Sequence, residues 1–205
     1  MAEVLTYVPP GIDAVESLLH SVYHLHGVLE PRANQIGLGV DRTTTPGPLD
    51  STSITLGTTD LSLLPIVSAW HWPVDKQTDV NPRFVPASES PNPAPDLAVT
   101  GTPIMFCGSE GRYAPLRIAR AAMKDARTLD KIPLRLLRYV GVTVDATVDA
   151  QVITDANLRT VHQGCMFLLP SVELEHGKTY EVDVQAIQAG KPVGQVWTFS
   201  TRNPH

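Results

Sequence analysis

The sequence predicts a mainly β protein, in which a small α/β segment precedes a β-sandwich. From Gly101 onward, short apolar runs are divided by turn residues, a pattern that is typical of a sandwich. The run 180–186 alternates apolar and polar side chains, so one face of its sheet is expected to meet solvent. Near the N-terminus, a helical pattern is followed by a turn and a glycine-rich strand.

The N-terminal helix is predicted from its ends and its periodicity. Asp13 can act as the N-cap, because Glu16 follows at capping-box spacing. Gly27 is expected to end the helix, since glycine adopts positive φ without strain, and Pro31 prevents its continuation. One apolar stripe at helical spacing is formed by Val15, Leu18, Leu19 and Val22. Residues 35–40 (QIGLGV) then predict a strand whose glycines leave room for close packing.

Three histidines lie on or beside this helix: His20, His24 and His26. His20 and His24 stand at i, i+4, a spacing that can hold a metal ion on one helix face. The alternative, ordinary side chains on a half-exposed helix, is favoured because no glutamate completes an HExxH pattern and no cysteine or further histidine lies nearby at ligand spacing. We therefore keep His24 and His20 as candidate metal ligands and name no catalytic residue.

The helix and strand resemble the C-terminal half of a bacterial CAP domain, of the SCP-like or cysteine-rich secretory protein superfamily. The resemblance is carried by Ala14-Val15, Tyr23-His24, Leu29-Glu30-Pro31 and Ile36-Gly37-Leu38-Gly39. It places His24 at the second cavity histidine of that family, while Leu25 replaces the usual arginine. In the family, this histidine joins another histidine and two acidic residues around a cleft that sometimes holds a divalent metal. The first histidine and a Gly-Glu-Asn segment are expected upstream, where residues 1–12 do not match.

Two later stretches extend the resemblance. Residues 72–80 (WPVDKQTDV) and 89–93 (ESPNP) resemble the segment that joins the CAP part to a C-terminal sandwich in these bacterial proteins. Glu89 lies there as a candidate carboxylate, although nothing ionisable converges on it in the sequence. Residues 174–180 and 197–201 resemble the final hairpin of immunoglobulin-like or fibronectin-like modules, which makes Trp197 a core residue. The predicted fold is thus a CAP-like remnant followed by an immunoglobulin-like β-sandwich.

The domain boundaries follow from proline content. Six prolines fall between residues 73 and 95, a density that blocks helices and central strands. We predict a partial CAP-like segment at 1–72, a proline-rich linker and edge strand at 73–100, and the sandwich at 101–205. Eight basic residues occur between 112 and 138; they predict a solvated face of a strand pair, with a helix as the alternative.

The two cysteines, Cys107 and Cys165, lie in the apolar strand-like runs PIMFC and GCMFLLP. Two buried free thiols are one interpretation. A disulfide that links two strands of the sandwich is the other, and we favour it because the family resemblance implies an oxidising compartment.

Composition excludes several classes of function. The net charge of −5 and pI of 5.7 argue against a nucleic-acid partner. No apolar run is long enough to span a membrane, and the first residues do not resemble a signal peptide. No nucleophile elbow, P-loop, dinucleotide-binding motif or zinc-type cysteine cluster occurs.

The sequence therefore favours a non-enzymatic binding or structural module, secreted, periplasmic or on the cell surface by family resemblance. We expect it to assemble with other chains, as a homo-oligomer or larger assembly, through the exposed helix and the sandwich, without a cofactor. The alternative is a CAP-type cleft protein, a metal-binding hydrolase or a lipid or sugar binder, with His24 in a site completed by a partner segment. A sugar-binding sandwich is a third hypothesis.

Overall fold

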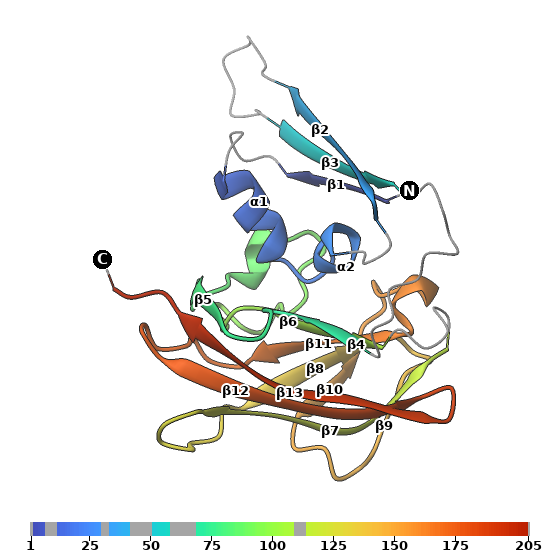
Figure 1. Ribbon diagram of the computed structural model, residues 1–205, viewed down its shortest axis with the longest axis vertical. Helices are drawn as coiled ribbons and strands as arrows, with labels where there is room; N and C mark the ends of the chain where they lie inside the picture. The colour runs from blue at the N-terminus through green and yellow to red at the C-terminus, as the bar shows by residue number, and fades with distance from the viewer. Residues whose placement is uncertain are drawn as a thin grey trace. The chain divides into compact units, whose positions relative to one another are not determined.

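A computed structural model of the chain describes residues 2–6, 12–29, 33–41, 51–57, 69–108 and 114–204. The protein is mainly β and divides into two compact units, Met1–Ile66 and Val67–His205 (Figure 1). We describe each unit by itself.

The first unit is a three-stranded antiparallel sheet with two short helices on one side of it (Figure 1). The strand order is β1-β3-β2, so β3 is central and β2 is an edge among the described strands. Its small core joins Leu18 of α1 to Ile54 and Leu56 of β3. The elements are β1 (Ala2–Thr6), α1 (Ile12–Leu19), α2 (Leu25–Val28), β2 (Gln35–Asp41) and β3 (Ser51–Gly57).

The predicted strand at 35–40 is confirmed as β2, but the single predicted helix is wrong. α1 begins at Ile12, so Asp13 lies inside the helix, and the helix ends at Leu19. Ser21 explains the break: its hydroxyl donates to the carbonyl of Leu18 at 2.8 Å and accepts from the backbone N–H of His24 at 3.3 Å. Serine competes in this way with helical hydrogen bonds. A second helix, α2, then begins at Leu25 and includes Gly27.

The second unit is a β-sandwich of two five-stranded sheets, as predicted for the chain from Gly101 onward. The first sheet has the order β10-β8-β11-β6-β4, and the second has the order β5-β13-β12-β7-β9. The elements are β4 (Ala69–Trp72), β5 (Gln77–Val80), the 3-10 helix η1 (Pro86–Ser88), β6 (Ile104–Gly108), β7 (Leu116–Asp125), β8 (Leu134–Arg138), β9 (Thr143–Val144), β10 (Gln151–Thr154), the 3-10 helix η2 (Thr160–His162), β11 (Cys165–Pro170), β12 (Thr179–Gln188) and β13 (Lys191–Thr201).

The sandwich core lies between the two sheets. Phe106 and Leu168 face it from one sheet, while Val182, Trp197 and Phe199 face it from the other. Trp197 is buried, as the sequence predicted, and stacks on His71 with ring centroids 4.0 Å apart. The alternative of a helix within 112–138 is wrong, because β7 and β8 occupy the described part of that range.

The predicted disulfide is confirmed between Cys107 and Cys165. The two cysteines are direct partners on the neighbouring antiparallel strands β6 and β11. Both are buried, on the face of the first sheet that points away from the sandwich core, together with Met105, Leu137 and Phe167. The central strands β6, β8 and β11 are therefore buried on both faces of this sheet.

The proline-rich segment packs onto that outer face of the first sheet. Arg135 of β8 is buried there, and its guanidinium donates to both carboxylate oxygens of Asp96 at 2.7 and 2.6 Å. Arg135 also donates to the side-chain oxygen of Gln151. The Arg135 guanidinium lowers the pKa of the Asp96 carboxyl to about 2. The segment is thus attached to the sandwich by a bidentate ion pair.

Candidate functional site

A hollow lies beside β7, at the side of the sandwich. Its volume is about 560 Å³, within the range of small-ligand sites. A smaller hollow of about 300 Å³ continues it along the strand. We call the two together the β7 groove; its central residues are Ala119, Arg120, Ala121, Ala122, Met123, Lys131, Val148 and Asp149.

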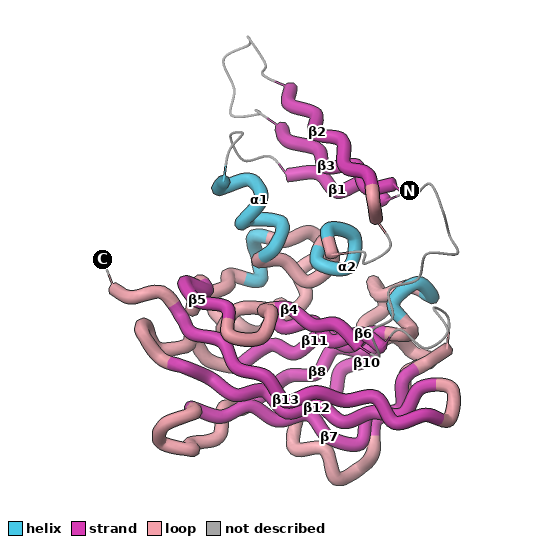
Figure 2. Tube along the Cα trace, viewed as in Figure 1, coloured by secondary structure: helices cyan, strands magenta, loops and turns pink. Residues whose placement is uncertain are grey.

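Figure 2 shows β7 beside β12 in the second sheet. The outer edge of β7 is only partly paired, and the groove lies there. At one end, β9 pairs with Arg117 and Ile118 alone. At the other end, the backbone N–H of Ile132 donates to the carbonyl of Met123 at 2.9 Å. Between these two points, no described residue adds a strand to β7.

The backbone of Ala121 faces this gap. The Met123 carbonyl points away from β12, since it accepts from Ile132 on the outer side. In an antiparallel ladder, the N–H and C=O of every second residue point to the same side. Ala121 stands two residues before Met123 in an unbroken register with β12, so its N–H and C=O both point outward. One donor and one acceptor of β7 are therefore left to a partner that no described strand supplies.

A β-bulge shapes the groove. Arg120 pairs with Gln185 and Ile118 pairs with Ala186, so Ala119 is an extra residue in β7. Bulges redirect side chains and interrupt pairing. Here the bulge places Arg117 and Arg120 on the same solvated face although they are three residues apart, and it coincides with the end of the pairing to β9.

The charges around the groove are balanced. Three cations line it, and each pairs with an acid of its own: Arg120 with Asp183, Lys124 with Glu181 at 2.9 Å, and Lys131 with Asp149 at 3.1 Å. The lining includes three alanines of β7, of which Ala121 is buried and Ala119 and Ala122 are half-buried. The groove therefore suits an uncharged ligand that exchanges hydrogen bonds with a backbone amide.

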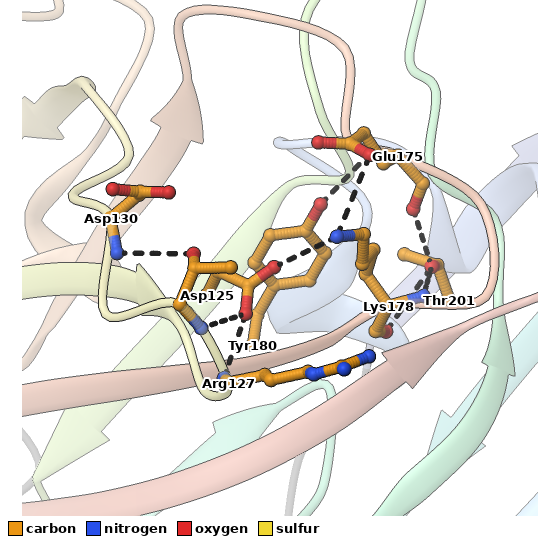
Figure 3. Close-up of polar contacts among 8 residues, drawn as sticks. Asp125, Arg127, Asp130, Glu175, Lys178, Tyr180 and Thr201 are labelled. Carbon is orange, nitrogen blue, oxygen red and sulfur yellow. Dashed lines mark hydrogen bonds and ion pairs between the residues drawn. The ribbon is translucent and has the colours of Figure 1, made fainter.

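A second polar cluster lies at the far end of β7 (Figure 3). The carboxylate of Asp125 accepts hydrogen bonds from the backbone N–H groups of Thr128 at 2.9 Å and Arg127 at 2.7 Å. These bonds, together with Lys178 at 3.4 Å, lower the pKa of the Asp125 carboxyl. Asp125 thus holds the turn that follows β7.

The remaining members of this cluster hold the turn before β12 (Figure 3). The Tyr180 hydroxyl accepts from the N–H of Glu175 at 2.9 Å, and the Thr201 hydroxyl donates to the Glu175 carbonyl at 2.6 Å. Burial raises the pKa of the Tyr180 phenol. The polar groups of the cluster form hydrogen bonds and ion pairs with one another and with the backbone. We therefore interpret the cluster as structural.

The predicted metal ligands lie in the first unit. α1 ends before His20 and α2 begins after His24, so the two imidazoles are not held at the i, i+4 spacing of one helix. His24 Nδ1 lies 3.0 Å from the Ser21 hydroxyl. Within the described ranges, no group of three or more His, Cys, Asp or Glu side chains could hold a metal ion. Metal binding by His20 and His24 stays a prediction.

Glu89, the other carboxylate singled out from the sequence, is buried beside the 3-10 helix η1. Among the residues that carry the CAP resemblance, Glu30 and Pro31 lie outside the described residues, as does Arg112 of the basic stretch.

Sequence reasoning missed the β7 groove, although β7 carries a signal of it. Its buried residues Leu116, Ile118, Ala121 and Met123 are spaced by two, three and two residues. A strand with regular alternation would show steps of two throughout. The step of three marks the bulge at Ala119.

No protein-family model, curated protein or solved structure matches this chain in the three comparisons. The CAP-like and immunoglobulin-like resemblances therefore stay hypotheses. None of the helices in the described part of the chain is long and apolar enough to cross a membrane.

Proposed function

We propose that this chain is a binding module that works outside the reducing cytosol and assembles with other chains through its sandwich. In this proposal, a protruding segment of a partner protein enters the β7 groove and presents a peptide group to Ala121. The proposal rests on Ala121, whose outward N–H and C=O are not paired with any described strand. Ala121 lines the hollow of about 560 Å³.

A peptide group matches this position because it offers one acceptor and one donor at the spacing of a β ladder. The balanced charges of the groove suit an uncharged main chain. Ala119 and Ala122 line the groove and are half-buried, and their short side chains would let another backbone approach. The gap between β9 and Ile132 limits the contact to a short stretch, so we propose a loop or chain end as the occupant and not a long added strand.

The disulfide supports an extracellular, periplasmic or cell-surface location. Disulfides persist in oxidising compartments and are rare in the cytosol. Cys107 and Cys165 are the two cysteines of the sequence, and they are paired. The location remains part of the proposal.

The test fills the groove with a large side chain. Peptides that bind the wild-type chain would be selected from a displayed random library. Their affinities for the wild type and for Ala122→Trp would then be compared. Ala122 lines both hollows of the groove. Val196→Trp is the matched control, because Val196 is exposed on β13, two strands away in the same sheet. We expect Ala122→Trp to weaken peptide binding at least about tenfold, or about 1.4 kcal/mol, and Val196→Trp to leave it unchanged.

Amide hydrogen exchange supplies the structural readout. A bound peptide is expected to slow exchange of the Ala121 N–H, because it occupies that donor. Peptides that bind Ala122→Trp as tightly as the wild type, or that leave the Ala121 amide unprotected, would contradict the proposal. Oligosaccharides that protect this amide when peptides do not would favour a sugar-binding sandwich.

A further inference from the structure

The edge strand β2 of the first unit exposes an apolar stripe. Ile36, Leu38 and Val40 are 66, 69 and 50% exposed. They stand opposite Leu56, Ile54 and Thr52 of β3, which are buried. Directly paired residues of an antiparallel sheet point to the same face. The stripe therefore continues the apolar face that β3 turns toward the helices.

The helices leave this part of the sheet uncovered. α1 packs on β1 and contributes Leu18 to the cluster with Ile54 and Leu56, while α2 packs on β1 and β3. On the other face, β2 presents Gly37 and Gly39, which carry no side chain. Among the described strands, β2 pairs on one side only, and a seven-residue strand with such an edge is a ready template for another strand.

The sequence of β2 has an internal two-fold pattern. When QIGLGVD is paired antiparallel with itself about Leu38, Leu38 faces Leu38 and Ile36 faces Val40. Gly37 then faces Gly39, and Gln35 faces Asp41. Every apolar side chain meets an apolar partner, and the two aspartates of a symmetric pair stand at opposite ends, each against a neutral amide. Like charges would not oppose each other at any position.

We propose that β2 pairs antiparallel with β2 of a second copy of this chain, centred on Leu38, so that two three-stranded sheets join into one of six strands. The pairing is isologous, as in most homodimers, since the same strand serves both partners. It satisfies the edge backbone groups and places the two apolar stripes side by side. This surface is separate from the β7 groove and does not depend on the peptide binding proposed there.

The interface is short compared with the standard size of stable complexes, so the dimer is expected to form in a concentration-dependent way. Light scattering on the full chain, from about 10 µM to about 1 mM, tests this. We expect the mass to rise from 22.2 kDa toward twice that value. Leu38→Lys places two like charges opposite each other and is expected to abolish the rise. Leu38 is exposed, so this change does not disturb a core.

Val140→Lys is the matched control, because Val140 is 66% exposed and lies in a turn of the second unit. It makes the same exchange of an exposed apolar side chain for a cation and should leave the mass increase intact. A wild-type chain that stays at 22.2 kDa over the whole range would overturn the proposal. So would a mass increase that Leu38→Lys leaves unchanged, because another surface or partner would then be responsible.

Cysteine cross-linking tests the register. The two native cysteines are bonded to each other, so an added thiol is the reactive one. Under mild oxidation, Leu38→Cys is expected to form a covalent dimer with itself. Ile36→Cys alone should not, but a mixture of Ile36→Cys and Val40→Cys chains should. Efficient self-linking of Ile36→Cys, or the absence of cross-links at Leu38→Cys, would overturn the proposed pairing.

Discussion

The two units of the molecule differ in the length of the strands at the edges of their sheets. In the sandwich, the outermost strands β4, β5 and β10 have four residues each, and β9 has two. Short edge strands offer little backbone to another chain. In the first unit, the edge strand β2 has seven residues and an exposed apolar stripe. Among the described strands, the sandwich offers short edges and the gap in the pairing of β7, whereas the first unit offers the whole length of β2.

The cause of this difference is the amount of core that each unit can build. In the sandwich, two five-stranded sheets bury each other, and the outer face of one sheet carries a buried disulfide and the ion pair of Arg135 with Asp96. In the first unit, two short helices cover only part of a three-stranded sheet. A small sheet cannot bury all its apolar residues without another layer or another strand. The first unit therefore leaves the apolar stripe of β2 exposed, and the proposed pairing rests on this surface.

The largest expected effect concerns the disulfide of the sandwich. Replacing both Cys107 and Cys165 by alanine removes a link across 58 positions. We expect the free energy of unfolding of the sandwich to fall by up to about 4 kcal/mol in the chain-entropy model. Urea denaturation of this variant, beside the wild type with and without reductant, measures the loss. Equal urea midpoints for the variant and the oxidised wild type would show that the disulfide does not account for the stability of the sandwich.

A smaller effect is expected at the ion pair that holds the proline-rich segment. Asp96→Asn removes a carboxylate that accepts two hydrogen bonds from the buried Arg135, so the urea midpoint should fall. The pKa of Asp96 is lowered from 3.8 to about 2. A lowered carboxyl pKa stabilises the fold above the unfolded pKa, and this contribution is lost as pH falls through the folded pKa.

The difference in urea midpoint between wild type and Asp96→Asn should therefore be greatest above about pH 5. It should decrease to zero as the pH falls from about 4 to about 2. Asp149→Asn is the control, since its ion pair with Lys131 is exposed and contributes little. A difference that stays constant down to pH 2 would contradict the assigned role of Asp96.

The smallest expected effect is at His24 in the first unit. If assembly depends on β2 and not on a metal, His24→Ala should change neither the metal content nor the mass of the chain. Elemental analysis and light scattering of wild type and variant measure both quantities. A stoichiometric metal that is bound by the wild type and lost in His24→Ala would favour the CAP-type cleft hypothesis.

Alternation predicted β12 of the sandwich well, because a strand that separates core from solvent must alternate its side chains. β1 of the first unit was not predicted. The faces of β12 were readable in this way: Tyr180, Val182, Val184 and Ala186 are buried, as their spacing predicted. The end of α1 was not readable, since Ser21 fits the helical pattern and breaks the helix only through its own hydrogen bonds.

The candidate sites could not be predicted from the sequence, because they depend on contacts between distant parts of the chain. The gap at Ala121 depends on where β9 and Ile132 meet β7, which are contacts between distant parts of the chain. The openness of β2 depends on the sheet order β1-β3-β2, which its own residues do not specify. Periodicity reports the local face of a strand but not which strand becomes an edge.

Amide hydrogen exchange of the full chain at two protein concentrations tests the central claim most directly. We expect protection in Gln35–Asp41 to increase with concentration, because β2 pairs with a second copy. Exchange of the Ala121 amide should be the same at both concentrations, because the partner proposed for it is a different chain. Exchange of Gln35–Asp41 that does not change with concentration would contradict the claim that a second copy completes the first unit.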